Sequence, residues 1–95
     1  GVSFAFIYGS YAKGEERKTS DIDVMIIGKI NENALISKLD QLENQIKREI
    51  NYNLYTLDGF KADIKSKNSF LLEIMANKKI MLIGSENELR TIYKG

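Results

Sequence analysis

Two short apolar runs near the start of the chain are separated by a polar segment. Residues 2–8 are rich in β-forming residues and almost continuously apolar, which is typical of a buried central strand. A second strand is predicted over residues 21–27, where two aspartates precede an apolar run and Gly28 ends it. The chain should therefore begin with two strands of one sheet.

The segment between these strands is predicted to open with a tight turn. Gly9 can adopt backbone angles closed to other residues and lets a ligand approach the main chain. Residues 10–13 resemble one helical turn, and Gly14 is placed to stop it. Residues 15–20 are charged and polar, so we expect an exposed loop.

A long amphipathic helix is predicted next, capped by Asn31 or Asn33. Apolar residues recur there at three- and four-residue intervals, as on the buried stripe of a helix. They are Leu35, Leu39, Leu42, Ile46 and Ile50, with Ile36 widening the stripe. The spacing also fits a coiled coil, but it lasts only about two heptads, so we expect the stripe to pack across the sheet.

A third strand is predicted over residues 50–56. Ile50, Tyr52 and Leu54 should share one face, and Asn51, Asn53 and Tyr55 the other. Thr56 is suited to cap a short helix over residues 57–65.

The last third of the chain predicts a helix, a strand and a helix. The helix starts at Asn68 or Ser69, and its predicted buried side is Phe70, Leu71, Ile74 and Met75. Residues 80–83 predict a fourth, fully buried strand closed by Gly84. Residues 85–88 form a capping-box pattern for a final helix with Leu89 and Ile92 on its apolar side.

The alternation of strands and helices places the chain in the α/β (α+β) class, with one mixed sheet of about four strands and helices packed on it. Residues 1–95 should form a single domain. Because Gly1 leads directly into a strand, we expect a fragment that lacks an upstream segment or domain.

The amino-acid composition limits the kinds of catalytic and metal-binding site that the chain can form. The chain has no cysteine and no histidine, which excludes thiolate nucleophiles and the usual imidazole base and ligand. Metal binding must then use oxygen ligands, which favours magnesium, manganese or calcium. A net charge of +1 argues against direct nucleic-acid binding. No apolar run approaches the roughly 20 residues of a membrane span, and no signal-peptide pattern is visible, so a cytoplasmic location is the default expectation.

Asp21 and Asp23 are the first candidates for a site. Two residues apart on a strand, they point to the same face, while Ile22 and Val24 supply the buried face. Two like charges on one face repel unless a cation joins them, and a divalent ion bound by both carboxylates resolves that conflict. The alternative is a strand edge whose acidic residues simply face water.

The Gly9-Ser10 turn is the second candidate. Backbone N–H groups and the Ser10 hydroxyl can hold phosphate oxygens at a helix start, with Lys13 one turn further on. Arg17 and Lys18 lie in the loop, from which they could reach a polyphosphate. Gly-Ser is also an ordinary turn sequence, and the three cations are also consistent with surface charge.

Taken together, the turn and the aspartates resemble the signature of the DNA polymerase beta-like nucleotidyltransferase superfamily. More closely, they are similar to the small, minimal nucleotidyltransferase domains of prokaryotes. The segments that carry the resemblance are Gly9-Ser10-Tyr11-Ala12-Lys13-Gly14 and Ser20-Asp21-Ile22-Asp23-Val24-Met25.

The resemblance implies a nucleotidyltransferase fold and two-metal phosphoryl-group chemistry. It makes Asp21 and Asp23 catalytic ligands of Mg²⁺, with Gly9, Ser10, Lys13 and Ser20 as nucleotide-binding residues. The reaction would transfer a nucleoside monophosphate from a nucleoside triphosphate to an acceptor hydroxyl and release pyrophosphate. Minimal domains of this kind often act with a separate helical partner protein, which makes the acceptor a candidate partner; homo-oligomerisation is left open.

A third carboxylate is usual in active members of this family, on the next core strand. The position that aligns with it is Asn51, which brings no charge, and Glu49 shares its strand parity and is our candidate for the third catalytic acid. The alternative hypothesis is therefore a catalytically weakened, nucleotide-binding regulatory domain. Residues 50–84 also resemble nucleotidyltransferase-like domains fused behind winged-helix DNA-binding domains. A plain interaction module is the third hypothesis.

Overall fold

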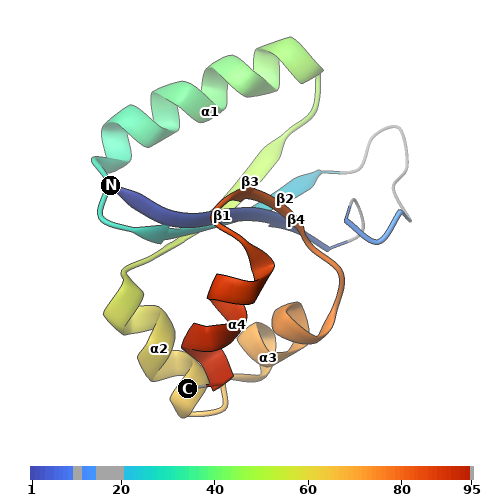
Figure 1. Cartoon of the computed structure of the whole chain (residues 1–95). Coiled ribbons are helices and arrows are strands. Elements are labelled where there is room, and N and C mark those ends of the chain that lie inside the picture. Colours follow the sequence, from blue (N-terminus) through green and yellow to red (C-terminus); the bar gives the residue numbers. More distant parts are fainter. Residues whose placement is uncertain (10–11, 15–20, 95) are drawn as a thin grey trace.

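The structure is a computed structural model, and it describes residues 1–9, 12–14 and 21–94. Four strands and four helices lie in these residues (Figure 1). In chain order they are β1 (Val2–Tyr8), β2 (Ile22–Gly28), α1 (Glu32–Ile46), β3 (Ile50–Tyr55), α2 (Leu57–Lys65), α3 (Ser69–Ala76), β4 (Ile80–Ile83) and α4 (Glu86–Lys94). The α+β class and the order of elements are as predicted. No described helix is long and apolar enough to cross a membrane.

The four strands form one mixed sheet in the order β3-β2-β1-β4. β1 runs antiparallel to both of its neighbours, whereas β2 and β3 are parallel and are joined through α1. The prediction that β1 is a central strand is confirmed. Figure 1 shows α1 on one face of the sheet and α2, α3 and α4 on the other.

Successive residues of the strands point to opposite faces of the sheet and contribute to two hydrophobic clusters, one on each face. The cluster under α1 is built from Ala5, Ile22, Val24, Ile26, Leu35 and Leu39, joined by Ile50, Tyr52 and Leu54. The larger cluster under α2, α3 and α4 includes Phe4, Phe6, Tyr8, Met25, Ile27, Phe60, Leu71 and Leu89. Asp23 has the parity of Met25, so its side chain leaves the sheet on the face of the larger cluster.

Local capping fixes where the helices begin. The side chains of Asn31, Thr56 and Asn68 each accept a hydrogen bond from the backbone N–H three residues on, at 3.2, 3.0 and 3.1 Å. At the start of α4, Ser85 Oγ accepts from the Glu88 N–H at 3.1 Å. Asn31 and Asn68 are thus selected from the alternatives that the sequence left open.

The predicted apolar stripe of α1 is only half correct. Leu35 and Leu39 are buried, but Ile36, Leu42 and Ile46 are each about two-fifths exposed. Figure 1 shows why: α1 rises away from the sheet toward its C-terminal end. The helix ends at Ile46, and Ile50 belongs to β3.

The prediction that residues 80–83 are fully buried is wrong. β4 is an edge strand, and Ile80, Leu82 and Ile83 are 40, 56 and 46% exposed. The helices leave this edge of the sheet partly uncovered, and Met81 is the one residue of β4 that packs against the larger cluster. An apolar run therefore did not distinguish an edge strand from a central one.

Candidate active site

Three polar side chains meet at one end of the sheet, where β1 ends and β2 and β3 begin. The strand register pairs Asp23 with Tyr8 across the antiparallel ladder and with Asn51 across the parallel one. Residues opposite each other in a ladder have side chains on the same face. The ladder thus sets Asn51 beside Asp23. Asp21, the residue before β2, is joined to Asn51 by a side-chain hydrogen bond.

The Asn51 amide lies between the two carboxylates. Its Nδ2 donates to Asp21 Oδ2 at 3.2 Å. The pKa of the Asp23 carboxyl is raised, mainly because the group is partly buried. A side-chain hydrogen bond with Asn51 lowers this pKa, and the negative charge of Asp21 raises it. The site therefore holds Asp23 in an environment that disfavours its charge, and a bound cation would relieve this.

Gly9 approaches Asp23 from the end of β1. Its φ is +78°, and a Cβ at this position would lie 2.9 Å from Asp23 Oδ2. The Lys13 N–H donates to the Gly9 carbonyl at 3.1 Å, which holds Lys13 close to the end of β1. The turn at the end of β1 is thus in direct proximity to the carboxylates.

Some predicted site residues lie outside the described residues. Ser10 and Ser20 are among them, as are Arg17 and Lys18, so their roles stay predictions. Glu49 is exposed and precedes β3, and its backbone carbonyl accepts from the Ile22 N–H at 2.9 Å. Its role as a third acid also stays a prediction.

The donor set suits a hard cation. Two carboxylates and an amide offer oxygen ligands, which Mg²⁺, Mn²⁺ and Ca²⁺ prefer. In the described ranges, no group of three Asp, Glu, His or Cys residues is arranged to hold a metal ion. Asp21 and Asp23 would therefore supply the charge, and Asn51 or a ligand the remaining oxygens.

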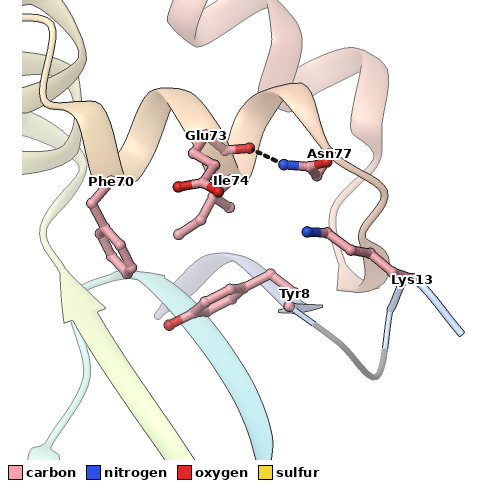
Figure 2. Close-up of a pocket in the computed structure, with 7 residues that line it drawn as sticks. Tyr8, Lys13, Phe70, Glu73, Ile74 and Asn77 are labelled. Carbon is pink, nitrogen blue, oxygen red and sulfur yellow. Dashed lines mark hydrogen bonds between the residues drawn. The ribbon is translucent and has the colours of Figure 1, made fainter. Parts of the chain in front are cut away.

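A cavity of about 180 Å³ opens beside this cluster, between the end of β1 and α3 (Figure 2). Tyr8, Phe70 and Ile74 form its apolar walls, and Gly9 and Lys13 line it on the side of the turn. Figure 2 shows the Lys13 side chain extending toward the cavity.

The cavity was not predicted from the sequence, because one of its walls is a side chain that the sequence places in the core. Phe70 was expected to be buried, but it is 43% exposed, whereas its neighbours Leu71, Ile74 and Met75 pack inward. Its ring meets Tyr8 edge to face, with centroids 6.0 Å apart. The Tyr8 hydroxyl in turn accepts from Asn53 Nδ2 at 2.7 Å, which fixes the ring that forms the cavity floor.

Comparison with known proteins gives a family match over most of the chain. The family model described as "Polymerase beta, Nucleotidyltransferase" matches residues 1–88. That range contains the turn, both aspartates, Asn51 and the cavity.

Curated relatives occur in the archaeon Methanocaldococcus jannaschii. Among those named "Putative protein adenylyltransferase" are MJ1547, 34% identical over 83 residues, and MJ1217, 40% identical over 63 residues. The matches cover 87 and 66% of this chain and 57 and 54% of the relatives. The chain thus spans little more than half the length of these proteins.

Solved structures with the same fold include two toxin-antitoxin complexes. One, described as a toxin-antitoxin with AMP-PNP, aligns over 98% of this chain and 69% of its own, with a TM-score of 0.63 and 17% identity. A mutant of the complex named MntA-HpeT aligns over the same shares with a TM-score of 0.62 and 15% identity. At this identity the likeness concerns the fold.

Proposed function

This chain belongs to the polymerase beta-like nucleotidyltransferase family, and on that premise we propose that it transfers a nucleoside monophosphate from a nucleoside triphosphate to an acceptor hydroxyl. In this reaction the acceptor oxygen forms a bond to the α-phosphorus. The bond from the α-phosphorus to the oxygen that bridges it to the β-phosphate breaks, and pyrophosphate leaves. The hydroxyl proton passes to solvent or to a carboxylate of the site.

One observation carries the proposal: the register that sets Asp21, Asp23 and Asn51 side by side next to Gly9. Two carboxylates bridged by one amide at the end of a sheet, with the main chain of a glycine close beside them, suit a metal-bound polyphosphate. The backbone turn alone would explain a glycine, but it does not require the close approach of that glycine to a carboxylate. This favours the functional interpretation over the plain interaction module.

The residues of the site would have different roles in binding the metal and the triphosphate. Asp21 and Asp23 would hold magnesium, which when bound neutralises phosphate charge and lowers the pKa of an attacking hydroxyl. Gly9 lets the main chain at the end of β1 come close to Asp23, where the phosphates would bind. Lys13 is exposed and is held near Gly9 by a backbone hydrogen bond, and it adds a positive charge for the triphosphate.

The relatives and neighbours suggest which substrates to test. Relatives named as putative protein adenylyltransferases support ATP as the donor and a protein hydroxyl as the acceptor. A neighbour described with AMP-PNP supports adenine nucleotide binding, and neighbours described as toxin-antitoxin complexes support a protein partner. We therefore infer adenylyl transfer to a partner protein.

Isothermal titration with ATP and Mg²⁺ tests the proposal directly. The wild type should bind ATP in a magnesium-dependent manner, and Asp21→Asn/Asp23→Asn should lose that binding. Asp40→Asn/Asp58→Asn removes two exposed carboxylates, on α1 and α2, and controls for the loss of two negative charges. Equal binding by wild type and the double variant, or none by either, would exclude the proposed metal–triphosphate site.

A second candidate function, that of a regulatory nucleotide-binding domain, is supported by Asn51. Asn51 stands opposite Asp23 in the ladder, where the family resemblance implies a third acid. This favours a domain that binds nucleotide and regulates without efficient transfer. Pyrophosphate release measured with ATP, Mg²⁺ and candidate protein acceptors separates the two: vigorous release supports the transferase, and binding without release supports the regulatory domain.

A further inference from the structure

The cavity between β1 and α3 adjoins the proposed phosphate site and shares two residues with it. Gly9 and Lys13 line it and also belong to the turn that faces Asp23. A nucleotide whose phosphates lie at this turn has its uncharged portion within reach of the cavity. We propose that the cavity binds the nucleobase of the triphosphate, with the Phe70 ring as its stacking wall; this rests on the proposed function.

The size of the cavity suits one ring system. Its volume of about 180 Å³ is below the roughly 300–1,000 Å³ of clefts that enclose whole drug-sized ligands. A base can enter while the ribose and phosphates stay outside. The walls are chemically suited as well, because Tyr8 and Phe70 present aromatic rings and Ile74 an aliphatic surface.

The charges around the cavity orient the ligand. Glu73 lines it on the α3 side and Lys13 on the side of the turn. The Glu73 carboxylate repels phosphate and the Lys13 ammonium attracts it, so the triphosphate should run from the cavity toward Lys13 and Asp23. The neutral base is left for the apolar walls.

Phe70 is the aromatic residue of α3, and it is partly exposed beside the cavity. Three neighbours on the same helix are buried, yet this ring remains 43% exposed and is held edge to face against Tyr8. Tyr8 is itself fixed by the hydrogen bond from Asn53. The ring therefore offers a positioned aromatic face at little cost in reorganisation.

Paired titrations test this assignment. ATP and inorganic tripolyphosphate, each with Mg²⁺, are titrated into wild type, Phe70→Ala and Leu72→Ala. Leu72 is a matched control, since it lies on α3, is 41% exposed and is not among the residues that line the cavity. Phe70→Ala should weaken ATP binding by roughly ten- to a hundredfold and leave tripolyphosphate binding unchanged. Leu72→Ala should change neither.

The outcomes separate this inference from the proposed function. If wild type binds ATP and Phe70→Ala binds it equally well, the base lies elsewhere and the inference is overturned. Equal losses for ATP and tripolyphosphate would also overturn it, because the ring would then act on the phosphate site or the fold. If wild type binds neither ligand, the proposed function fails and this inference with it.

A second variant keeps the test valid if Phe70→Ala folds poorly. The chain has no tryptophan, so Phe70→Trp keeps an aromatic wall and adds a single fluorescent reporter. ATP should change its emission, and tripolyphosphate should not. Emission that is insensitive to ATP in a variant that still binds ATP would overturn the assignment.

Discussion

The α-carbon of Gly9 lies against the carboxylate of Asp23, so closely that a methyl group in place of its hydrogen would come within 2.9 Å of Oδ2. Gly9 also has a φ of +78°, where side chains are disfavoured. The end of β1 thus needs glycine for two separate reasons. One concerns the backbone, and the other concerns the space beside a proposed metal ligand.

Gly9→Ala should therefore lose both stability and function. The left-handed backbone alone costs about 1–2 kcal/mol for a residue with a Cβ. The contact with Asp23 adds a displacement of the carboxylate, so Mg²⁺-dependent ATP affinity should fall by about tenfold or more. Thermal unfolding and isothermal titration measure the two effects.

Gly14→Ala is the matched control. Gly14 has a φ of +75°, but a Cβ there would meet no atom within 4 Å. This variant should lose a similar amount of stability and keep its ATP affinity. If both variants lose affinity equally, the strain of the turn and not the contact with Asp23 is responsible.

Features set by local rules could be predicted from the sequence. Asn31 and Thr56 cap their helices because each side chain reaches the N–H three residues on, an interaction contained within one turn. The parity of Asp21, Asp23 and Asn51 follows from the two-residue period of a strand. Only the pairing of β2 with β3 was needed to bring these residues together.

Features that depend on the arrangement of distant elements could not be predicted. Whether Leu82 is buried depends on which helices cover β4, and whether Phe70 is buried depends on how α3 is oriented against the sheet. Because Phe70 was predicted to be buried, the cavity that it lines could not be predicted either. Lys79 is a similar case, since a lysine in the sequence suggests a solvated surface and this one is enclosed.

The Asp23 pKa predicts how stability depends on pH. In the folded chain this pKa is raised, mainly by burial. The folded protein therefore binds the proton more tightly than the unfolded chain does. The ionised carboxylate costs stability at neutral pH, and this cost is lost as pH falls through the folded pKa to below the unfolded value of about 3.9.

Asp23→Asn should accordingly melt higher than wild type at pH 7. The carboxylate is only partly buried, so we expect a small rise in Tm of about 2–4 °C. The difference should vanish below about pH 4. Mg²⁺ should raise the Tm of wild type and not that of the variant, and Asp40→Asn corrects for net charge. A gap between the two melting curves that does not change with pH would contradict the burial argument.

Lys79 joins α3 to α4, and its loss should destabilise the wall of the cavity. Its side chain is only 1% exposed, and its ammonium donates to the carbonyls of Met75 and Asn77 at 3.1 and 3.2 Å and pairs with Glu86 at 3.1 Å. Lys79→Met would leave these acceptors without the donor and should cost about 2 kcal/mol. Lys78→Met, at an exposed position, should cost little. Urea unfolding of both variants measures the difference, and equal midpoints would show that the buried contacts contribute nothing.

Asn51→Asp would supply the acidic side chain that the ladder position opposite Asp23 lacks. Without metal, a third carboxylate should lower Tm, because it adds repulsion to a site where Asn51 now donates to Asp21. With Mg²⁺ the order should reverse, and pyrophosphate release should rise by about tenfold or more, a barrier reduction of about 1.4 kcal/mol.

Two further variants decide where the third acid is. Asn51→Ala removes the amide without adding a charge, so it should bind Mg²⁺ more weakly than wild type and show no gain in release. Glu49→Gln tests the other candidate, which lies just before β3. If Glu49→Gln abolishes release while Asn51→Asp adds nothing, Glu49 is the third acid and the position opposite Asp23 needs no charge. If Asn51→Asp raises release and Glu49→Gln leaves it intact, the amide at position 51 is what limits transfer in the natural chain.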